Sequence, residues 1–178
     1  MMSIWRGMAG LGACLLAVGM AGCAGPIETR SGLTGTALPA NAAVALAVSH
    51  EQDGPLVDAV RRAVAEQLAA RGHPADAEGA ARVVVTFAER PASLEVLAAK
   101  GAVLSAAKRR RAMQNCADRT FRLTLVAERT GEAPSRAWAE EHHCKAAPGS
   151  SIGALAAQAA AALAGKTSAR PALRSGQD

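Results

Sequence analysis

Apolar side chains recur at every second position in two stretches of the first half of the chain. In residues 42–49, AAVALAVS, they are Val44, Leu46 and Val48, and in residues 81–90, ARVVVTFAER, they are Val83, Val85 and Phe87. A two-residue period places such side chains on one face of a pleated strand. We therefore predict two strands, the second ended by Pro91, because proline lacks the amide hydrogen that a central strand needs.

A helix is predicted between these two strands. Its apolar stripe, with a spacing of four residues, consists of Leu56, Val60, Val64 and Leu68. This spacing brings side chains to one face of an α-helix. Asp53 can cap the first turn, which contains Pro55, and the helix should end in residues 71–74, RGHP, where glycine and proline follow the stripe.

Residues 92–114 show no clear period. Leu94, Leu97 and Leu104 have a loosely helical spacing, but Gly101 and two β-branched valines weaken a helix there. We interpret residues 92–115 as a mobile insertion that contains a partial helix.

The stretch from residue 116 to residue 144 predicts a β-hairpin. Phe121, Leu123 and Leu125 alternate with polar residues and should face inward. The sequence ERTGE at 128–132 is typical of a three-residue loop in which Gly131 adopts a left-handed conformation. This loop would pair residues whose numbers sum to 260, such as Phe121 with Ala139, Leu123 with Ala137 and Cys116 with Cys144.

A second helix follows, starting from a cap at Ser150 or Ser151, with an inward face made of Ile152, Leu155, Ala159 and Leu163. The order of elements is therefore β-α-β, insertion, β-β-α. We predict an α+β fold, a two-layer sandwich of a four-stranded sheet with two helices on one face. Residues 42–165 should form this single domain.

The segments on either side of this domain lack hydrophobic periodicity. Residues 23–41 are rich in Gly, Pro, Ser and Thr and are typical of a flexible tether, and residues 166–178 are typical of a disordered tail. Residues 1–22 form a leader: one basic residue, Arg6, precedes an apolar stretch that ends in small residues. A retained membrane helix is the weaker alternative, because six glycines lie between residues 7 and 25.

The leader ends in Met20-Ala21-Gly22-Cys23, which resembles the lipobox of bacterial lipoproteins. The resemblance implies that Cys23 becomes the acylated first residue of the mature chain, whereas Cys14 lies too close to Arg6 for an apolar stretch and a cleavage site. Two or three acyl chains suffice for stable membrane attachment. Ala24 is not the Asp that retains enteric lipoproteins in the inner membrane, so we expect an outer-membrane anchor that faces the periplasm. An ordinary secretory leader is the alternative.

The order of elements, together with SRAW at 135–138, resembles small envelope lipoproteins of the lipopolysaccharide-assembly-lipoprotein type. The resemblance covers about 125 residues and implies an α/β sandwich that serves other envelope components. Residues 24–26, Ala-Gly-Pro, depart from the Gly-aromatic pair that follows the acylated cysteine in that family.

The sequence EEHHC at 140–144 contains the only cluster of metal-type ligands in the chain. In an oxidising compartment the hairpin register favours a disulfide between Cys116 and Cys144, beside solvated histidines. The alternative is a transition-metal site made by Glu140, His142 and a free Cys144, which share one face of a strand.

A basic cluster follows the insertion: Lys108, Arg109, Arg110, Arg111, Arg119 and Arg122. It is either a solvated loop or a contact for anionic lipid headgroups or lipopolysaccharide phosphates. Binding of nucleic acid is not expected, because the chain has no Tyr, two Phe and two Trp and offers few rings for base stacking.

The sequence contains no nucleophile elbow and no glycine-rich phosphate loop between a strand and a helix. We therefore expect a non-catalytic protein without a cofactor, anchored to the membrane through acyl chains, that binds an envelope protein or an anionic lipid. The alternatives are a metal-binding envelope protein and a secreted enzyme with no recognisable motif.

Overall fold

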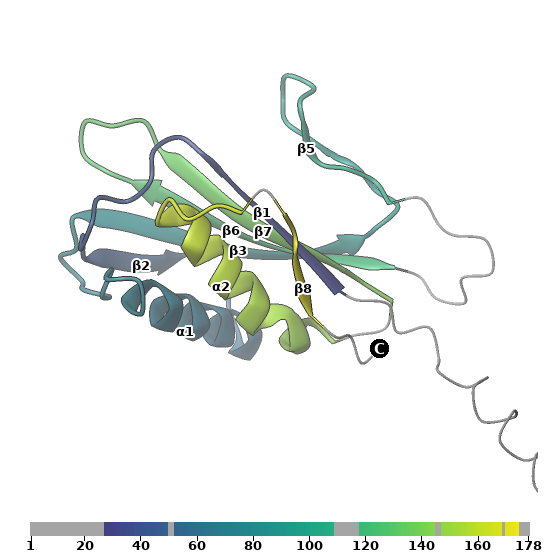
Figure 1. Ribbon diagram of the computed structural model, residues 1–178, viewed down its shortest axis with the longest axis horizontal. Helices are drawn as coiled ribbons and strands as arrows, with labels where there is room; N and C mark the ends of the chain where they lie inside the picture. The colour runs from purple at the N-terminus through teal and green to yellow at the C-terminus, as the bar shows by residue number, and fades with distance from the viewer. Residues whose placement is uncertain (1–26, 50–51, 109–117, 145–146, 169, 175–178) are drawn as a thin grey trace, which may run out of the picture.

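The computed structural model describes residues 27–49, 52–108, 118–144, 147–168 and 170–174 (Figure 1). Its main element is a six-stranded sheet in the order β2-β3-β6-β7-β1-β8. The strands are β1 (Ile27–Thr34), β2 (Val44–Val48), β3 (Ala81–Pro91), β6 (Arg119–Glu128), β7 (Ser135–His143) and β8 (Ala172–Arg174). β2 and β3 are parallel and every other neighbouring pair is antiparallel.

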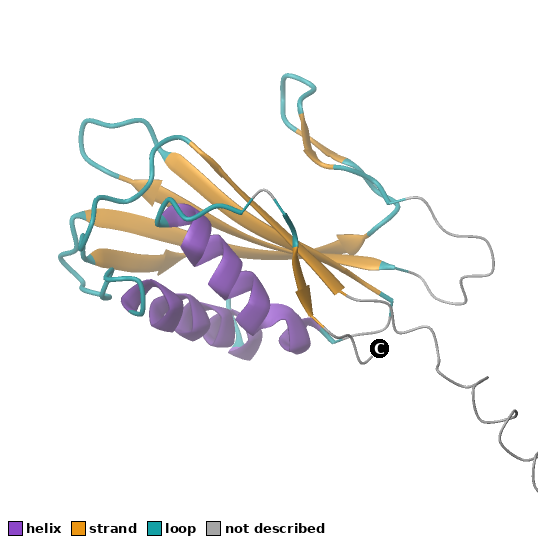
Figure 2. Ribbon diagram, in the orientation of Figure 1, coloured by secondary structure: helices purple, strands orange, loops and turns teal. Residues whose placement is uncertain are grey.

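Two helices, α1 (Pro55–Ala69) and α2 (Ile152–Leu163), pack against each other and cover one face of this sheet (Figure 2). A short 3-10 helix, Pro148–Ser151, leads into α2. The core lies between the helices and the inward side chains of β3, β6 and β7, with Phe87 stacked on Phe121. A separate two-stranded hairpin, β4 (Val96–Leu97) and β5 (Val103–Ser105), projects from the opposite side of the sheet.

The inward faces of both helices are confirmed. Val60, Val64 and Leu68 of α1 are buried, as is the whole predicted face of α2. The capping residue of α1 was predicted wrongly: Gly54, with φ of 98°, takes the N-cap position in place of Asp53 and makes no side-chain cap. Leu56, at the start of the stripe, stays 38% exposed.

The predicted four-stranded sheet is wrong, because β1 and β8 extend it to six strands. Residues 27–34 were expected within the flexible tether, and residues 172–174 within the disordered tail. Instead β1 pairs with β7 over six residues and β8 pairs with the first half of β1. Backbone hydrogen bonds to partners distant in the sequence stabilise these strands, and local periodicity does not reveal such partners.

The register of the β6–β7 hairpin also differs from the prediction. Opposite residues sum to 262, so that Leu123 pairs with Ala139 and Phe121 with Glu141. The loop is longer than three residues, since β6 ends at Glu128 and β7 begins at Ser135, although Gly131 does have a φ of 77°. A shift of two residues keeps every side chain on its face, so the hydrophobic pattern is compatible with both registers.

The insertion contains the β4–β5 hairpin and no helix among residues 92–108, which corrects the predicted partial helix. Residues 109–115 of the insertion lie outside the described part of the chain. None of the described helices is long and apolar enough to span a bilayer.

Candidate functional site

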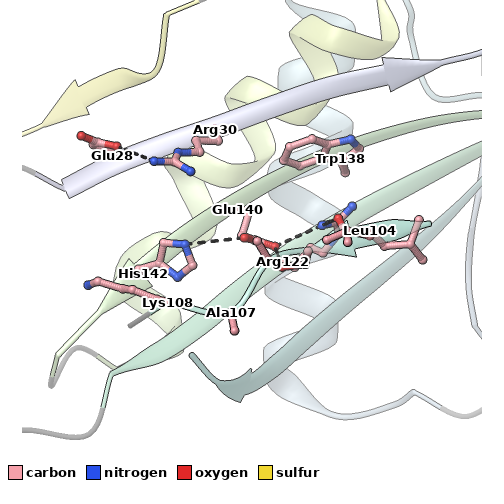
Figure 3. A pocket seen from close by; sticks show the side chains of 12 residues that line it. Glu28, Arg30, Leu104, Ala107, Lys108, Arg122, Trp138, Glu140 and His142 are labelled. Carbon is pink, nitrogen blue, oxygen red and sulfur yellow. Dashed lines mark hydrogen bonds and ion pairs between the residues drawn. The ribbon is translucent and has the colours of Figure 1, made fainter. Parts of the chain in front are cut away.

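The helix-free face of the sheet carries a pocket of about 600 Å³, which we call the flap pocket (Figure 3). Strands β1, β6 and β7 form its floor. The segment Val103–Lys108, which contains β5 and which we call the flap, covers it. Residues with even numbers on β6 and β7 point to this face, because their odd-numbered neighbours are buried against the helices. The pocket is therefore separated from the hydrophobic core by the sheet itself.

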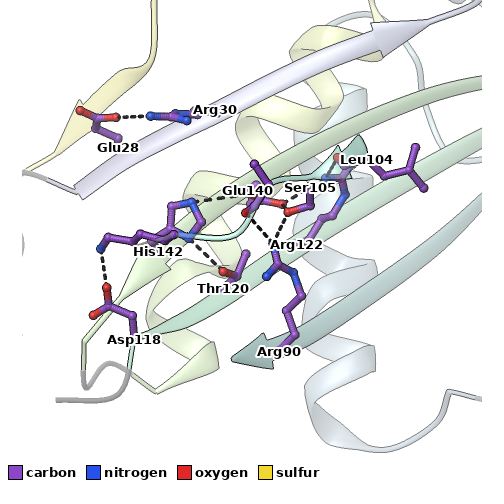
Figure 4. Close-up of polar contacts among 12 residues, drawn as sticks. Glu28, Arg30, Arg90, Leu104, Ser105, Asp118, Thr120, Arg122, Glu140 and His142 are labelled. Carbon is purple, nitrogen blue, oxygen red and sulfur yellow. Dashed lines mark hydrogen bonds and ion pairs between the residues drawn. The ribbon is translucent and has the colours of Figure 1, made fainter. Parts of the chain in front are cut away.

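Glu140 is the central side chain of the floor and is only 6% exposed. It accepts a hydrogen bond from the hydroxyl group of Ser105, and its Oε2 lies 3.1 Å from Nη1 of Arg122 (Figure 4). On its other side, its Oε1 lies 3.6 Å from Nε2 of His142. A buried carboxylate is stable only with such partners. Glu140 therefore links the flap, through Ser105, to strands β6 and β7 of the sheet.

Two arginines of the sheet donate hydrogen bonds to the flap. Arg122 donates to the carbonyl oxygen of Leu104 over 2.6 Å, and Arg90 donates to the Ser105 hydroxyl group and to the carbonyl oxygen of Ala106. Burial lowers the pKa of Arg122 from its usual value, and the hydrogen bond to Glu140 opposes this effect. The cover of the pocket is thus fixed by charge-assisted hydrogen bonds to β3 and β6.

Trp138 provides the aromatic part of the lining. The guanidinium carbon of Arg122 lies 4.5 Å from the centroid of the indole ring, a cation–π contact. The ring lies against Gly32, which pairs with Trp138 across β1 and β7. Of the two tryptophans of the sequence, Trp138 lies within the described residues, and Trp5 belongs to the predicted leader. In a chain without residues 1–22, Trp138 is the sole tryptophan and can report on the pocket by fluorescence.

His142 lies at the end of the pocket near the start of β1. Its Nδ1 lies 2.9 Å from the Thr120 hydroxyl group. Burial lowers the pKa of His142, and the positive charges of Lys108 and Arg30 lower it further, although Glu140 raises it. The imidazole is therefore neutral at pH 7, when it can both donate and accept a hydrogen bond.

The predicted basic cluster does not form one unpaired surface among its described members. Lys108 pairs with Asp118 at 2.6 Å, Arg122 pairs with Glu140, and Arg119 pairs with Glu89. Arg119 and Arg122 lie three positions apart on β6 and point to opposite faces of the sheet. Lys108 and Arg122 both line the flap pocket. Arg109, Arg110 and Arg111 lie outside the described residues.

Several residues that line the flap pocket were not predicted from the sequence. Arg30 and Glu28 belong to β1, within the predicted tether, and Ser105 belongs to the hairpin within the predicted insertion. Trp138 is the sole tryptophan beyond the predicted leader, but its place in a pocket depends on the pairing of β1 with β7. The sequence predicted Lys108, Arg122, Glu140 and His142 as candidate binding residues, but their assembly into one pocket depends on the tertiary structure.

The alternative metal site is not assembled among the described residues, where no group of three His, Cys, Asp or Glu side chains could hold an ion. Glu140 and His142 do share a face, but Cys144 is disulfide-bonded and offers no thiolate. Cys14, Cys23 and Cys116 lie outside the described residues. The pairing of Cys116 with Cys144 and the acylation of Cys23 therefore stay predictions.

A second polar cluster lies on the helix side of β7, where solvated histidines were expected. His143 is 1% exposed, and its Nε2 lies 2.8 Å from Oε2 of Glu141, which is fully buried. Arg174 of β8 donates to the same carboxylate over 2.8 Å, and the Thr29 hydroxyl group donates to its other oxygen. Burial alone would raise the pKa of Glu141, but these hydrogen bonds outweigh it and lower the pKa to about 2.

This buried cluster superficially resembles a catalytic triad. The Ser151 hydroxyl group lies 2.7 Å from Nε2 of His143, the same nitrogen that contacts Glu141. In a triad the serine and the carboxylate use opposite nitrogens of the imidazole ring. Ser151 is also fully buried, so a substrate has no access to it. We therefore assign this cluster to the stability of the fold.

No family model matches the chain, and no curated protein matches it. Among solved structures, the PelC dodecamer of Paraburkholderia phytofirmans aligns over 76% of this chain and 96% of its own, with 12% identity and a TM-score of 0.44. A variant of that dodecamer, with the same coverage and identity, gives a TM-score of 0.46. A PDZ domain protein from Parabacteroides distasonis aligns over 72% of this chain and 35% of its own, with 9% identity and a TM-score of 0.42.

Proposed function

We propose that this protein is a membrane-anchored lipoprotein of the bacterial envelope that binds another envelope component in the flap pocket without transforming it. The flap pocket carries this proposal, since charged, aromatic and imidazole side chains converge on a cavity of about 600 Å³. A concave site with a few converging polar groups is typical of ligand binding. The lipobox-like sequence at Cys23 supports the location.

The lining favours a polar ligand that carries an anionic group. Three cationic side chains, from Arg30, Lys108 and Arg122, face two carboxylates, from Glu28 and Glu140. An anionic group can exchange with the exposed carboxylate of Glu28 at Arg30, whose ion pair is solvated and therefore weak. Phosphate groups of lipopolysaccharide or of an anionic phospholipid have this chemistry.

Fluorescence of Trp138 tests the pocket directly. The protein for this experiment is the mature chain, residues 23–178, with Cys23→Ser, because every described element lies within residues 27–174. Titration with lipopolysaccharide, or with glycerol phosphate as a minimal headgroup, should give a saturable change in emission. Arg122→Gln should weaken the apparent affinity at least tenfold, because it removes a cation from the floor.

Arg82→Gln is the matched control, since Arg82 forms an exposed ion pair with Glu128 away from the pocket. Its affinity should equal that of the parent. The absence of a saturable change with either probe, or equal losses in both variants, would contradict binding in the pocket. The anchor is tested separately by the mass of the natural protein, whose first residue should be Cys23 with two or three acyl chains.

A further inference from the structure

The β4–β5 hairpin exposes an unusual amount of aliphatic surface. Leu94, Leu97 and Val103 are each more than half exposed, at 56%, 52% and 55%. Leu97 and Val103 pair across the two strands, so their side chains form one patch. Between Ala92 and Ala107 the only charged residues are Glu95 and Lys100. Clustered exposed aliphatic side chains mark a contact surface, whereas single ones are ordinary.

The hairpin projects from the body of the domain and is held firmly at its base (Figure 1). The amide group of Lys108 donates to the carbonyl oxygen of Ala92 over 2.7 Å, which closes the base. The Ala98 amide group donates to Ala102 over 2.8 Å near the tip. Arg90 adds hydrogen bonds to Leu94 and Ser105. The aliphatic patch is thus presented on an ordered support, which lowers the entropic cost of docking.

Basic residues follow this patch directly in the sequence. Lys108 at the base of the hairpin begins the run Lys-Arg-Arg-Arg at 108–111. Aliphatic side chains next to a basic run are typical of segments that lie in the interface of an anionic bilayer, where the apolar groups insert and the cations contact headgroups. Lys108 pairs with Asp118, and the three arginines that follow it in the sequence, which lie outside the described residues, give this stretch a net positive charge that complements an anionic phospholipid surface.

The position of the anchor places a bilayer within reach of the hairpin. Lys108 lines the flap pocket together with Glu28, so the base of the hairpin lies beside the start of β1. Residues 24–26 separate Cys23 from Ile27, and four extended residue steps span at most roughly 14 Å. An acylated Cys23 would hold the start of β1 at this distance from the membrane.

We infer that the β4–β5 hairpin docks on a bilayer that contains anionic phospholipid, inserting Leu94 and Leu97 into the interface. This inference rests on the proposed envelope location for the presence of the bilayer. The hairpin acts as a second contact that, together with the acyl chains, orients the domain and turns the mouth of the flap pocket toward the lipid surface.

Co-sedimentation with vesicles tests this inference on the mature chain with Cys23→Ser, which has no acyl chain. The vesicles are phosphatidylethanolamine and phosphatidylglycerol at a ratio of about 3:1, compared with pure phosphatidylcholine. The parent should bind the anionic vesicles, and Leu94→Ser/Leu97→Ser should lower the apparent affinity at least tenfold. Leu97→Trp should raise it, because Trp favours the headgroup level. Urea unfolding of Leu97→Trp should match that of the parent, which separates a gain at the hairpin from apolar surface exposed by misfolding.

Leu56→Ser is the matched control, since Leu56 is an exposed leucine of α1 on the other side of the sheet. It should bind like the parent. No binding by the parent, or equal binding by the double variant, would overturn the inference. The inference would also be overturned if the double variant bound vesicles like the parent but, in light scattering, lost a self-association that the parent shows. That result would indicate a second copy of the chain as the partner of the hairpin. A natural protein without lipid at Cys23 would contradict the anchor and leave this vesicle result intact.

Discussion

Gly32 and Trp138 are opposite each other in the register of β1 and β7, and the indole occupies the space that a side chain at position 32 would need. A Cβ atom built at Gly32 would lie 2.9 Å from three atoms of the ring. The glycine therefore sets the position of the aromatic wall of the flap pocket.

Gly32→Ala should displace the indole and destabilise the fold by about 1–2 kcal/mol, the usual cost of a forced repacking. Trp138 emission should change in the folded protein, and urea unfolding should show the loss of stability. Gly149→Ala is the control, because a Cβ at Gly149 meets no atom within 4 Å. Unchanged emission in Gly32→Ala would mean that the ring does not rest on β1.

The ion network of Glu141 predicts a loss of stability in acid. The pKa of Glu141 is lowered to about 2 in the folded protein, whereas a carboxyl of the unfolded chain titrates near 4.5. The unfolded chain therefore binds more protons between these two values. The contribution of Glu141, about 3 kcal/mol, is complete above pH 4.5 and is lost as the pH falls toward 2.

Glu141→Gln should remove most of this contribution at pH 7, because an amide cannot pair with Arg174 as a carboxylate does. The stability difference between parent and variant, measured by urea unfolding, should shrink from pH 5 to pH 2. Glu128→Gln breaks an exposed ion pair and should cost less than about 1 kcal/mol at any pH. A difference that does not depend on pH would contradict the assignment.

Local periodicity predicted those elements whose inward faces are apolar. The stripe of α1, the valines of β3 and Phe121 of β6 identify their own buried side, because hydrophobic burial alone decides their orientation. β1 was missed because its buried positions include Thr29, a polar residue that is stabilised by Glu141 of β7. A strand whose inward side depends on a partner more than a hundred residues away has no local signature.

The candidate site was predicted only in part, for the same reason: Lys108, Arg122, Glu140 and His142 were named as candidate residues, but not as parts of one pocket. Within EEHHC at 140–144, solvated histidines were predicted, but Glu141 and His143 are buried on the helix side, where Arg174 of β8 pairs with Glu141. The strand position of Glu140 and His142 on a common face was predicted correctly from the period of two. What covers them, the hairpin with Ser105, could not be inferred from an insertion without periodicity.

The titration of His142 should make the stability of the fold depend on pH near neutrality as well. Burial lowers its pKa, so the folded imidazole resists the proton that the unfolded chain takes up near pH 6.5. Stability should therefore fall as the pH decreases through 6.5, and His142→Gln should be less sensitive in this range. Histidine proton NMR should place the midpoint of His142 below 6.5. A midpoint at or above this value would contradict the burial argument.

Cys144 is disulfide-bonded in the structure. In the exported protein we expect its partner to be Cys116, 28 positions earlier in the sequence. A peptide map without reductant should contain the two cysteines in one linked fragment. Cys116→Ser/Cys144→Ser should lower the free energy of unfolding by about 3–4 kcal/mol, because the bridge restricts the unfolded chain. Two free thiols in the oxidised, folded protein would contradict the bridge and revive the metal site of Glu140, His142 and Cys144.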